Sequence, residues 1–281
     1  MKKFAAKKLM VLIPASTLFL TGCLEEVTSE LFRIDANNAQ DVIKAALDAK
    51  DAISHAFDAA EVMLNDTTTY PSGTSYTNIT YNVSCNDPAL NATTIPSNGD
   101  LTIGGNYSPS GTSNLTLSFN NCVIQNSTLN GSLSMSHIEN AGGVADYDES
   151  SLSGSLSADV TSDSGTLSLN LSNIVYDYTR NKANANGAIS TPATEPYTEF
   201  FQLSLSVPLM GSLSIDTPVI LEGDKKDTAS NKPSIGQMTV TAGGNTGAQL
   251  DANNGVATSY DVAADTDGDG VYETAVNTVN W

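Results

Sequence analysis

Cationic side chains are scarce in this chain of 281 residues, which has 12 Lys and Arg against 31 Asp and Glu and a formal net charge of −19. Four of the lysines lie in the first 22 residues, and without that segment the charge is −23. So negative a surface repels nucleic acids and bare anionic lipid headgroups, and it attracts divalent cations. The sequence therefore excludes nucleic acid as a partner.

Catalytic signatures are also scarce. The chain has two histidines, His55 inside a helical pattern and His137 at the end of a strand-like run. It contains no nucleophile-elbow, zinc-peptidase, phosphate-binding or dinucleotide-binding motif. Serine is abundant, but it recurs at every second position of strand-like segments, where a solvent-facing sheet surface accounts for it. We predict a non-catalytic protein, with a hydrolase acting on a glycan or an ester as the least favoured alternative.

The chain begins with a basic segment, residues 1–8, and continues as an apolar stretch over residues 9–20. A bilayer-spanning helix needs about 20 apolar residues, so this stretch is too short to cross. A basic start, a short apolar region and small residues before a cleavage point are typical of a secretory signal peptide. The sequence predicts such a peptide over residues 1–22.

Residues 20–23 read Leu-Thr-Gly-Cys. This ending is similar to the lipobox of bacterial lipoproteins, and the alternative is an ordinary cleaved signal with a chance cysteine. The resemblance implies cleavage before Cys23 and attachment of a diacylglyceryl thioether and an N-acyl group to Cys23, enough acyl chain for lasting membrane attachment. Leu24 follows, where enterobacterial lipoproteins of the inner membrane usually carry Asp, so the resemblance favours the outer membrane. Residues 23–37 are then the lipid anchor and a spacer.

Two further cysteines, Cys85 and Cys122, remain after Cys23 is assigned to lipid. In an oxidising envelope, two cysteines leave a single intrachain pairing, and no Cys-x-x-Cys motif or nearby histidine supports a metal site instead. We predict a disulfide between Cys85 and Cys122.

Residues 38–65 show the periodicity of an amphipathic helix. Apolar residues recur there at alternating spacings of three and four: Ala39, Val42, Ala46, Ala49, Ile53, Ala56, Ala60 and Met63. Asn38 is the expected N-cap. Most residues of this apolar stripe are alanine, and Lys50 interrupts its edge. We therefore expect the helix to pack on the protein's own sheet rather than form a coiled coil.

Residues 66–281 are predicted to form one antiparallel β-domain. One strand is visible near residues 79–85, and from Gly111 onward apolar residues alternate with Ser, Thr and Asn, as a sheet with one wet face requires. Further strands are expected near residues 236–241, 256–263 and 271–280. The Gly-Gly pairs at 104, 142 and 243 are interpreted as turns.

The tetrapeptide Gly-Ser-Leu-Ser occurs at residues 131, 154 and 211, and Gly-Thr-Leu-Ser at 165. Such repeats indicate either a β-solenoid or a meander of hairpins. Variable turn lengths and interrupting prolines favour the meander. The predicted fold is mainly β: a single antiparallel meander sheet or a curled sandwich or half-barrel, with the helix of residues 38–65 on its apolar face.

An acidic loop near the end of the chain carries Asp265, Asp267, Asp269, Gly270 and Glu273. Oxygen donors at positions one, three and five, glycine at six and an acid at nine are the pattern of a calcium loop. It resembles the Asp-x-Asp-x-Asp-Gly loops of EF-hands, dockerins and extracellular β-repeats, although valine stands at position twelve and the flanks look like strands. We predict structural Ca²⁺ bound by the four acids; the alternative is an acidic hairpin turn without an ion.

Taken together, the chain resembles β-rich envelope lipoproteins of proteobacteria. The leading hypothesis is a lipid-anchored envelope protein with a structural or interaction role, whose partners are the membrane and other envelope components. The second hypothesis is a carrier that holds a lipid or another amphiphile in a groove between sheet and helix.

Overall fold

The structure is a computed structural model that describes residues 32–64, 69, 74–85, 99–109, 111–140, 147–162, 165–181, 196–224, 232–252 and 258–281. The predicted signal peptide and Cys23 lie outside the described residues. Within the described part of the chain, no helix is both long and apolar enough to span a membrane.

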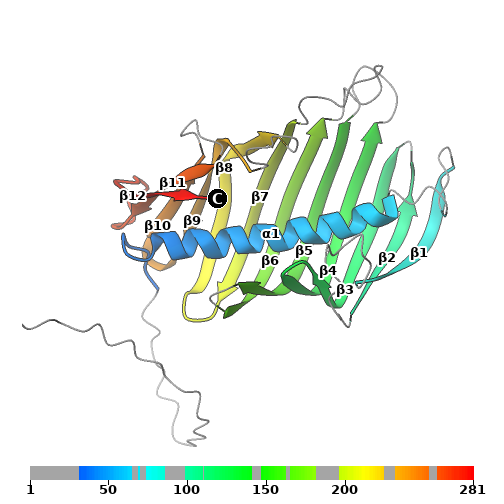
Figure 1. The fold of residues 1–281 in the computed structure, drawn as a ribbon, viewed down its shortest axis with the longest axis horizontal. Coiled ribbons are helices and arrows are strands. Elements are labelled where there is room, and N and C mark those ends of the chain that lie inside the picture. Colours follow the sequence, from blue (N-terminus) through cyan, green and yellow to red (C-terminus); the bar gives the residue numbers. More distant parts are fainter. Residues whose placement is uncertain are drawn as a thin grey trace, which may run out of the picture. The chain divides into compact units, whose positions relative to one another are not determined.

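The described residues form one long helix, one short 3₁₀ helix and twelve strands (Figure 1). They are α1 (Ala39–Leu64), β1 (Tyr76–Ser84), β2 (Asp100–Tyr107), β3 (Thr112–Ile124), β4 (Ser127–Asn140), β5 (Tyr147–Ser162), β6 (Gly165–Asn181), β7 (Pro196–Val207), β8 (Gly211–Asp224), β9 (Ile235–Thr241), η1 (Gly243–Asn245), β10 (Gly247–Asp251), β11 (Ser259–Asp265) and β12 (Thr274–Asn280). The strands pair in chain order from β1 to β12, every pair antiparallel. The predicted single meander sheet is confirmed.

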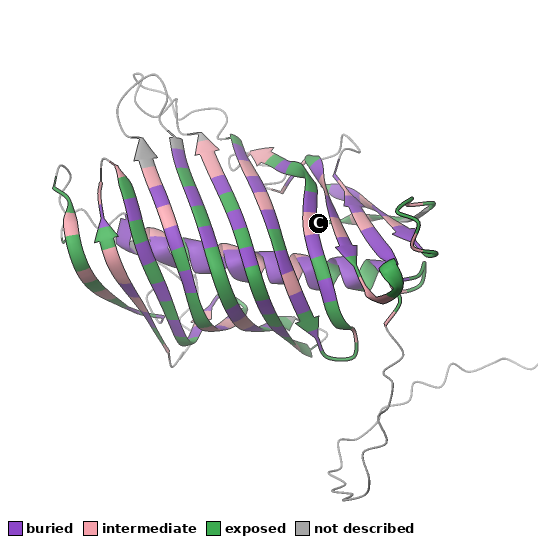
Figure 2. Ribbon diagram, turned by 180° about the vertical axis from the view of Figure 1, so that it is seen from behind, coloured by how far each residue is buried: buried purple, intermediate pink, exposed green. Residues whose placement is uncertain are grey.

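The sheet has one buried and one exposed face because apolar and polar residues alternate along its strands (Figure 2). In β3, Leu117 and Phe119 are buried and Ser118 between them is exposed. A bulge follows Phe119, where Asn121 adopts a left-handed φ of 48°. The extra residue returns Cys122 to the buried face and bends the strand. Register shifts also occur in the β5–β6, β6–β7 and β7–β8 pairings.

Helix α1 crosses the buried face of the sheet and contacts β3 to β7 and β9 to β12 (Figure 1). Small residues on the helix have no exposed surface: Ala39, Ala46, Ala49, Ala52, Ala56, Ala59 and Ala60. Because alanine ends at Cβ, the helix backbone can lie close to the large apolar side chains of the strands, as close packing of a protein interior requires. The predicted packing of the helix on the sheet is confirmed.

The helix begins differently from the prediction. Asn38 does not act as the cap; its side-chain amide donates to the Arg33 carbonyl at 2.9 Å, and its Oδ1 accepts from the Asp35 N–H at 2.9 Å. Asp35 instead accepts the N–H groups of Asn37 at 2.7 Å and of Asn38 at 3.2 Å. A turn over residues 36–38 therefore leads into the helix, and Asp35 is the residue that satisfies its first free N–H groups.

Two strands were not predicted. The Gly-Gly pair at 104, interpreted as a turn, lies inside β2, which corrects that prediction. Gly105 has a φ of 129°, and a Cβ there would lie 2.3 Å from the Asn114 carbonyl oxygen of β3. The close approach of β3 therefore selects glycine within a strand, where it usually marks a turn. The short strand β10 was missed as well, whereas the pair at 243 does form a turn, η1, and the pair at 142 lies outside the described residues.

Candidate functional site

The loop between β11 and β12 carries the three aspartates predicted to bind calcium. Asp265 ends β11 and is 2% exposed, whereas Asp267 and Asp269 lie on the exposed turn that follows. One carboxylate oxygen from each of the three lies within 4.8 Å of the other two. The loop therefore gathers three hard oxygen donors, the donor type that calcium takes in proteins.

Main-chain N–H groups of the same loop hold these carboxylates in place. The two oxygens of Asp265 accept from Gly268 at 2.7 Å and from Gly270 at 2.9 Å, and Asp267 accepts from the Asp269 N–H at 3.2 Å. Gly268 and Gly270 are left-handed, with φ of 83° and 86°. A Cβ on Gly268 would lie 2.7 Å from a carbonyl oxygen of η1. Glycine is thus needed for the tight turn, in agreement with the calcium-loop pattern.

Glu273, the predicted fourth ligand, is exposed and lies outside the group of three. It is still close enough to be affected by their charge: the negative charge of Asp267 has the largest effect in raising the pKa of Glu273, and the charges of Asp269 and Asp265 raise it further. A divalent cation among these carboxylates would relieve the repulsion. The role of Glu273 as a ligand stays a prediction.

Cys85 and Cys122 form the predicted disulfide, with their Cα atoms 5.4 Å apart. Both side chains are fully buried. Cys85 directly follows β1 and Cys122 lies in β3, so the bond fastens the edge strand β1 to the third strand across β2.

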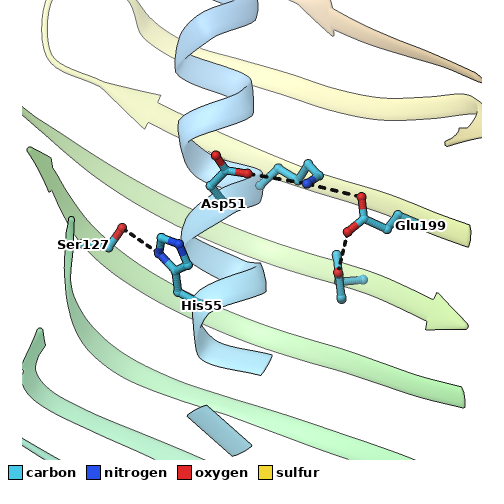
Figure 3. A network of polar contacts seen from close by, with 6 residues as sticks. Asp51, His55, Ser127 and Glu199 are labelled. Carbon is cyan, nitrogen blue, oxygen red and sulfur yellow. Dashed lines mark hydrogen bonds and ion pairs between the residues drawn. The ribbon is translucent and has the colours of Figure 1, made fainter. Parts of the chain in front are cut away.

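The two histidines are buried, and each contacts one serine. His55 Nδ1 hydrogen-bonds Ser127 Oγ at 3.1 Å (Figure 3), and His137 Nδ1 hydrogen-bonds Ser150 Oγ at 2.8 Å. Burial lowers the pKa of His55. Ser127 and Ser150 are each 1% exposed, so neither hydroxyl is open to a substrate. Each of the two pairs satisfies the hydrogen-bonding needs of buried polar groups between elements of the core.

A buried ion pair joins the middle of α1 to the sheet. Lys50 Nζ lies 3.2 Å from Glu199 Oε2 of β7 and 3.5 Å from Asp51 Oδ1 (Figure 3). The Tyr176 hydroxyl donates to Glu199 Oε1 at 3.1 Å. Burial acts to lower the pKa of Lys50, but the charges of Glu199 and Asp51 outweigh burial and raise it. The helix is therefore positioned by a charge pair as well as by apolar packing.

A second ion cluster holds the end of α1. Arg180 of β6 lies 3.0 Å from Glu61 of the helix and 2.8 Å from Asp148 of β5. Sequence reasoning missed both clusters. The sequence offered two signals: Lys50 at the edge of the alanine-rich stripe, and Arg180 as the one arginine of residues 66–281. Neither signal reveals the partner of the charge.

A pocket of about 280 Å³ opens where the exposed stripe of α1 meets the last strands. Its lining combines side chains of both charges with an apolar wall: Gln40, Asp41, Lys44, Leu47, Asp48, Lys50, Asp51, Lys232, Pro233, Tyr260, Val279, Asn280 and Trp281. The rings of Tyr260 and Trp281 pack at a centroid distance of 4.5 Å. A neighbouring pocket of about 220 Å³ shares Asp41, Lys44 and Asp48 and is also lined by the first residues of β6, Gly165 to Leu167, and by Met210.

Neither protein-family models, nor curated proteins, nor solved structures gave a match when compared with this chain.

Proposed function

We propose that this protein is a lipid-anchored component of a bacterial cell envelope, held at the outer membrane through Cys23, with a non-catalytic structural or interaction role. The observation that carries the proposal is the Cys85–Cys122 disulfide, because structural disulfides persist in oxidising compartments. Their pairing leaves Cys23, within the lipobox-like segment, as the remaining cysteine of the chain. The disulfide and the lipobox-like residues around the remaining cysteine both support an exported, lipid-anchored protein.

The interior of the domain supports a structural rather than a carrier role. The alternative of an acyl-chain groove between sheet and helix is not favoured, because the alanines of α1 that face the sheet have no exposed surface. The exposed face of the central strands offers short polar side chains at alternate positions, including Ser134, Ser153 and Ser206. This surface is available for contact with other envelope components.

We expect Cys23→Ser to abolish incorporation of radiolabelled palmitate and to shift the protein from the membrane to the soluble fraction. The substitution removes the sulfur that would form the thioether, and with it the acyl chains, each buried methylene of which contributes about 0.8 kcal/mol to membrane binding. The matched control is the double variant Cys85→Ser and Cys122→Ser, which should keep its label. An unlabelled parent protein, or a labelled Cys23→Ser variant, would refute the anchor.

The proposal includes a structural Ca²⁺ in the β11–β12 loop. Its support is the convergence of the Asp265, Asp267 and Asp269 carboxylates on a glycine-dependent turn. Because the loop joins the last two strands, an ion there would hold the β12 edge of the sheet. Calcium loops of extracellular modules bind with Kd of about 10⁻⁴ to 10⁻³ M.

We expect calcium at about 100 times its Kd to stabilise the purified full chain against thermal unfolding by about 2.7 kcal/mol. Asp267→Ala should remove this stabilisation, because it deletes one of the three converging donors. Asp261→Ala is the control: Asp261 lies in β11 and accepts a hydrogen bond from Thr278 at 2.6 Å, so its loss should leave the calcium-dependent shift intact. A calorimetric scan of the parent protein that is unchanged by calcium would remove the ion from the proposal.

A further inference from the structure

The pocket beside α1 contains several cationic side chains, although the protein has few of them. After removal of the first 22 residues, the chain keeps eight Lys and Arg, and three of these, Lys44, Lys50 and Lys232, line this one pocket. Three aspartates line it as well, so the lining is formally neutral. A neutral patch with both charge signs is distinct from the acidic surface of the protein as a whole.

Two of the three lysines in the pocket lie beside an aspartate of the same lining. Lys44 Nζ lies 2.8 Å from Asp48, on the exposed stripe of the helix, and Lys50 lies 3.5 Å from Asp51. Asp48 also faces the aromatic wall: burial raises the pKa of Tyr260, and the charge of Asp48 adds to that increase. A ligand in this pocket therefore meets a carboxylate and an ammonium within one helical turn, next to apolar surface.

The apolar part of the lining contains one unsatisfied donor. It includes Leu47 of α1, Tyr260 and Val279 of the last two strands, and Trp281 directly after β12, with the two rings in contact. The buried indole N–H of Trp281 has no acceptor among the described residues. Buried donors without an acceptor are uncommon in folded proteins, and a ligand oxygen would satisfy this one.

We propose that this pocket binds a small zwitterion with an apolar body, the chemistry of a free apolar amino acid. The ammonium group lies against the aspartates and the aromatic faces, which attract cations. The carboxylate lies against Lys44 and Lys232, and the apolar body packs on Leu47 and the rings. The volume is just below the range of roughly 300–1,000 Å³ that small-molecule sites usually have, which restricts the ligand to a small molecule. The long-range field of the acidic protein opposes a net anion, whereas a zwitterion carries no net charge.

Trp281 is the chain's one tryptophan, so its fluorescence reports on this pocket alone. The test titrates the purified full chain with L-phenylalanine, with phenylacetate, which lacks the ammonium, and with phenethylamine, which lacks the carboxylate. We expect a saturable change in Trp281 emission with phenylalanine and affinities about tenfold or more weaker for both single-charge analogues, because each loses a charge-assisted hydrogen-bond partner. Absence of a response to phenylalanine, or equal or tighter binding of either analogue, overturns the proposal.

Two variants locate the binding. Lys232→Met and Asp48→Asn should each weaken phenylalanine binding about tenfold, since each removes one charge that the ligand contacts. Arg33→Met is the control, because it removes a cation that does not line the pocket. Circular dichroism establishes that each variant is folded; the ligand series on the unaltered chain decides the proposal even if a variant is not. Folded variants that bind like the parent protein contradict it.

Discussion

We expect Lys50→Met to lower the free energy of unfolding by about 3–5 kcal/mol, the largest effect of any single substitution proposed for this protein. Methionine keeps the length of the lysine stem but leaves the Glu199 carboxylate without its cation. The Glu199 side chain is 4% exposed, so water does not replace the lost partner. Equilibrium unfolding in urea measures the loss.

Two further variants separate the buried charge from other effects of the substitution. Lys44→Met changes the same residue type on the same helix, but Lys44 is 55% exposed in its pair with Asp48, so the expected cost is below about 1 kcal/mol. The double variant Lys50→Met and Glu199→Met removes both charges and should recover most of the stability, because well-packed apolar residues commonly replace a buried ion pair without loss. Equal costs for Lys50→Met and Lys44→Met would show that the pair with Glu199 does not position the helix.

We expect the replacement of both Cys85 and Cys122 by alanine to lower the free energy of unfolding by about 4 kcal/mol, which is the second large effect. The disulfide closes a loop with a sequence separation of 37 residues, and in the chain-entropy description a loop of this length restricts the unfolded chain by about that amount. The edge strand β1 should also lose protection, because the bond is its covalent tie to β3.

Reduction of the parent protein provides an independent comparison. A reductant should move its urea midpoint to that of the Cys85→Ala and Cys122→Ala variant, and it should leave the variant unchanged. If the parent protein unfolds at the same urea concentration with and without reductant, the two cysteines are not paired in solution.

Local patterns were enough to predict the two layers of the fold. The alanine spacing from Ala39 to Ala60 predicted a helix that packs closely on a sheet, and the alternation after Gly111 predicted strands with one wet face. The Cys85–Cys122 pairing followed from counting. Each of these predictions depends on residues a few positions apart, or on a set with a single solution, and therefore needs no knowledge of distant neighbours.

The features that escaped prediction depend on contacts between distant parts of the chain. Position 105 in β2 is glycine because β3 lies too close to leave room for a Cβ, and the local sequence of β2 does not reveal that neighbour. Lys50 finds Glu199 on the seventh strand, and Arg180 finds Glu61 on the helix, so neither charge could be assigned a partner from its own surroundings. The pocket beside α1 likewise combines the helix with the last strand, which the sequence places at opposite ends of the domain.

Lipid at Cys23 is the central feature of the proposed function, and mass spectrometry of the N-terminal tryptic peptide of the membrane-extracted protein tests for it directly. The first arginine or lysine after residue 8 is Arg33, so a processed chain gives a peptide of residues 23–33. The account predicts that this peptide begins at Cys23 and carries a diacylglyceryl and an N-acyl group. A peptide of residues 9–33, or one with an unmodified Cys23, would contradict it.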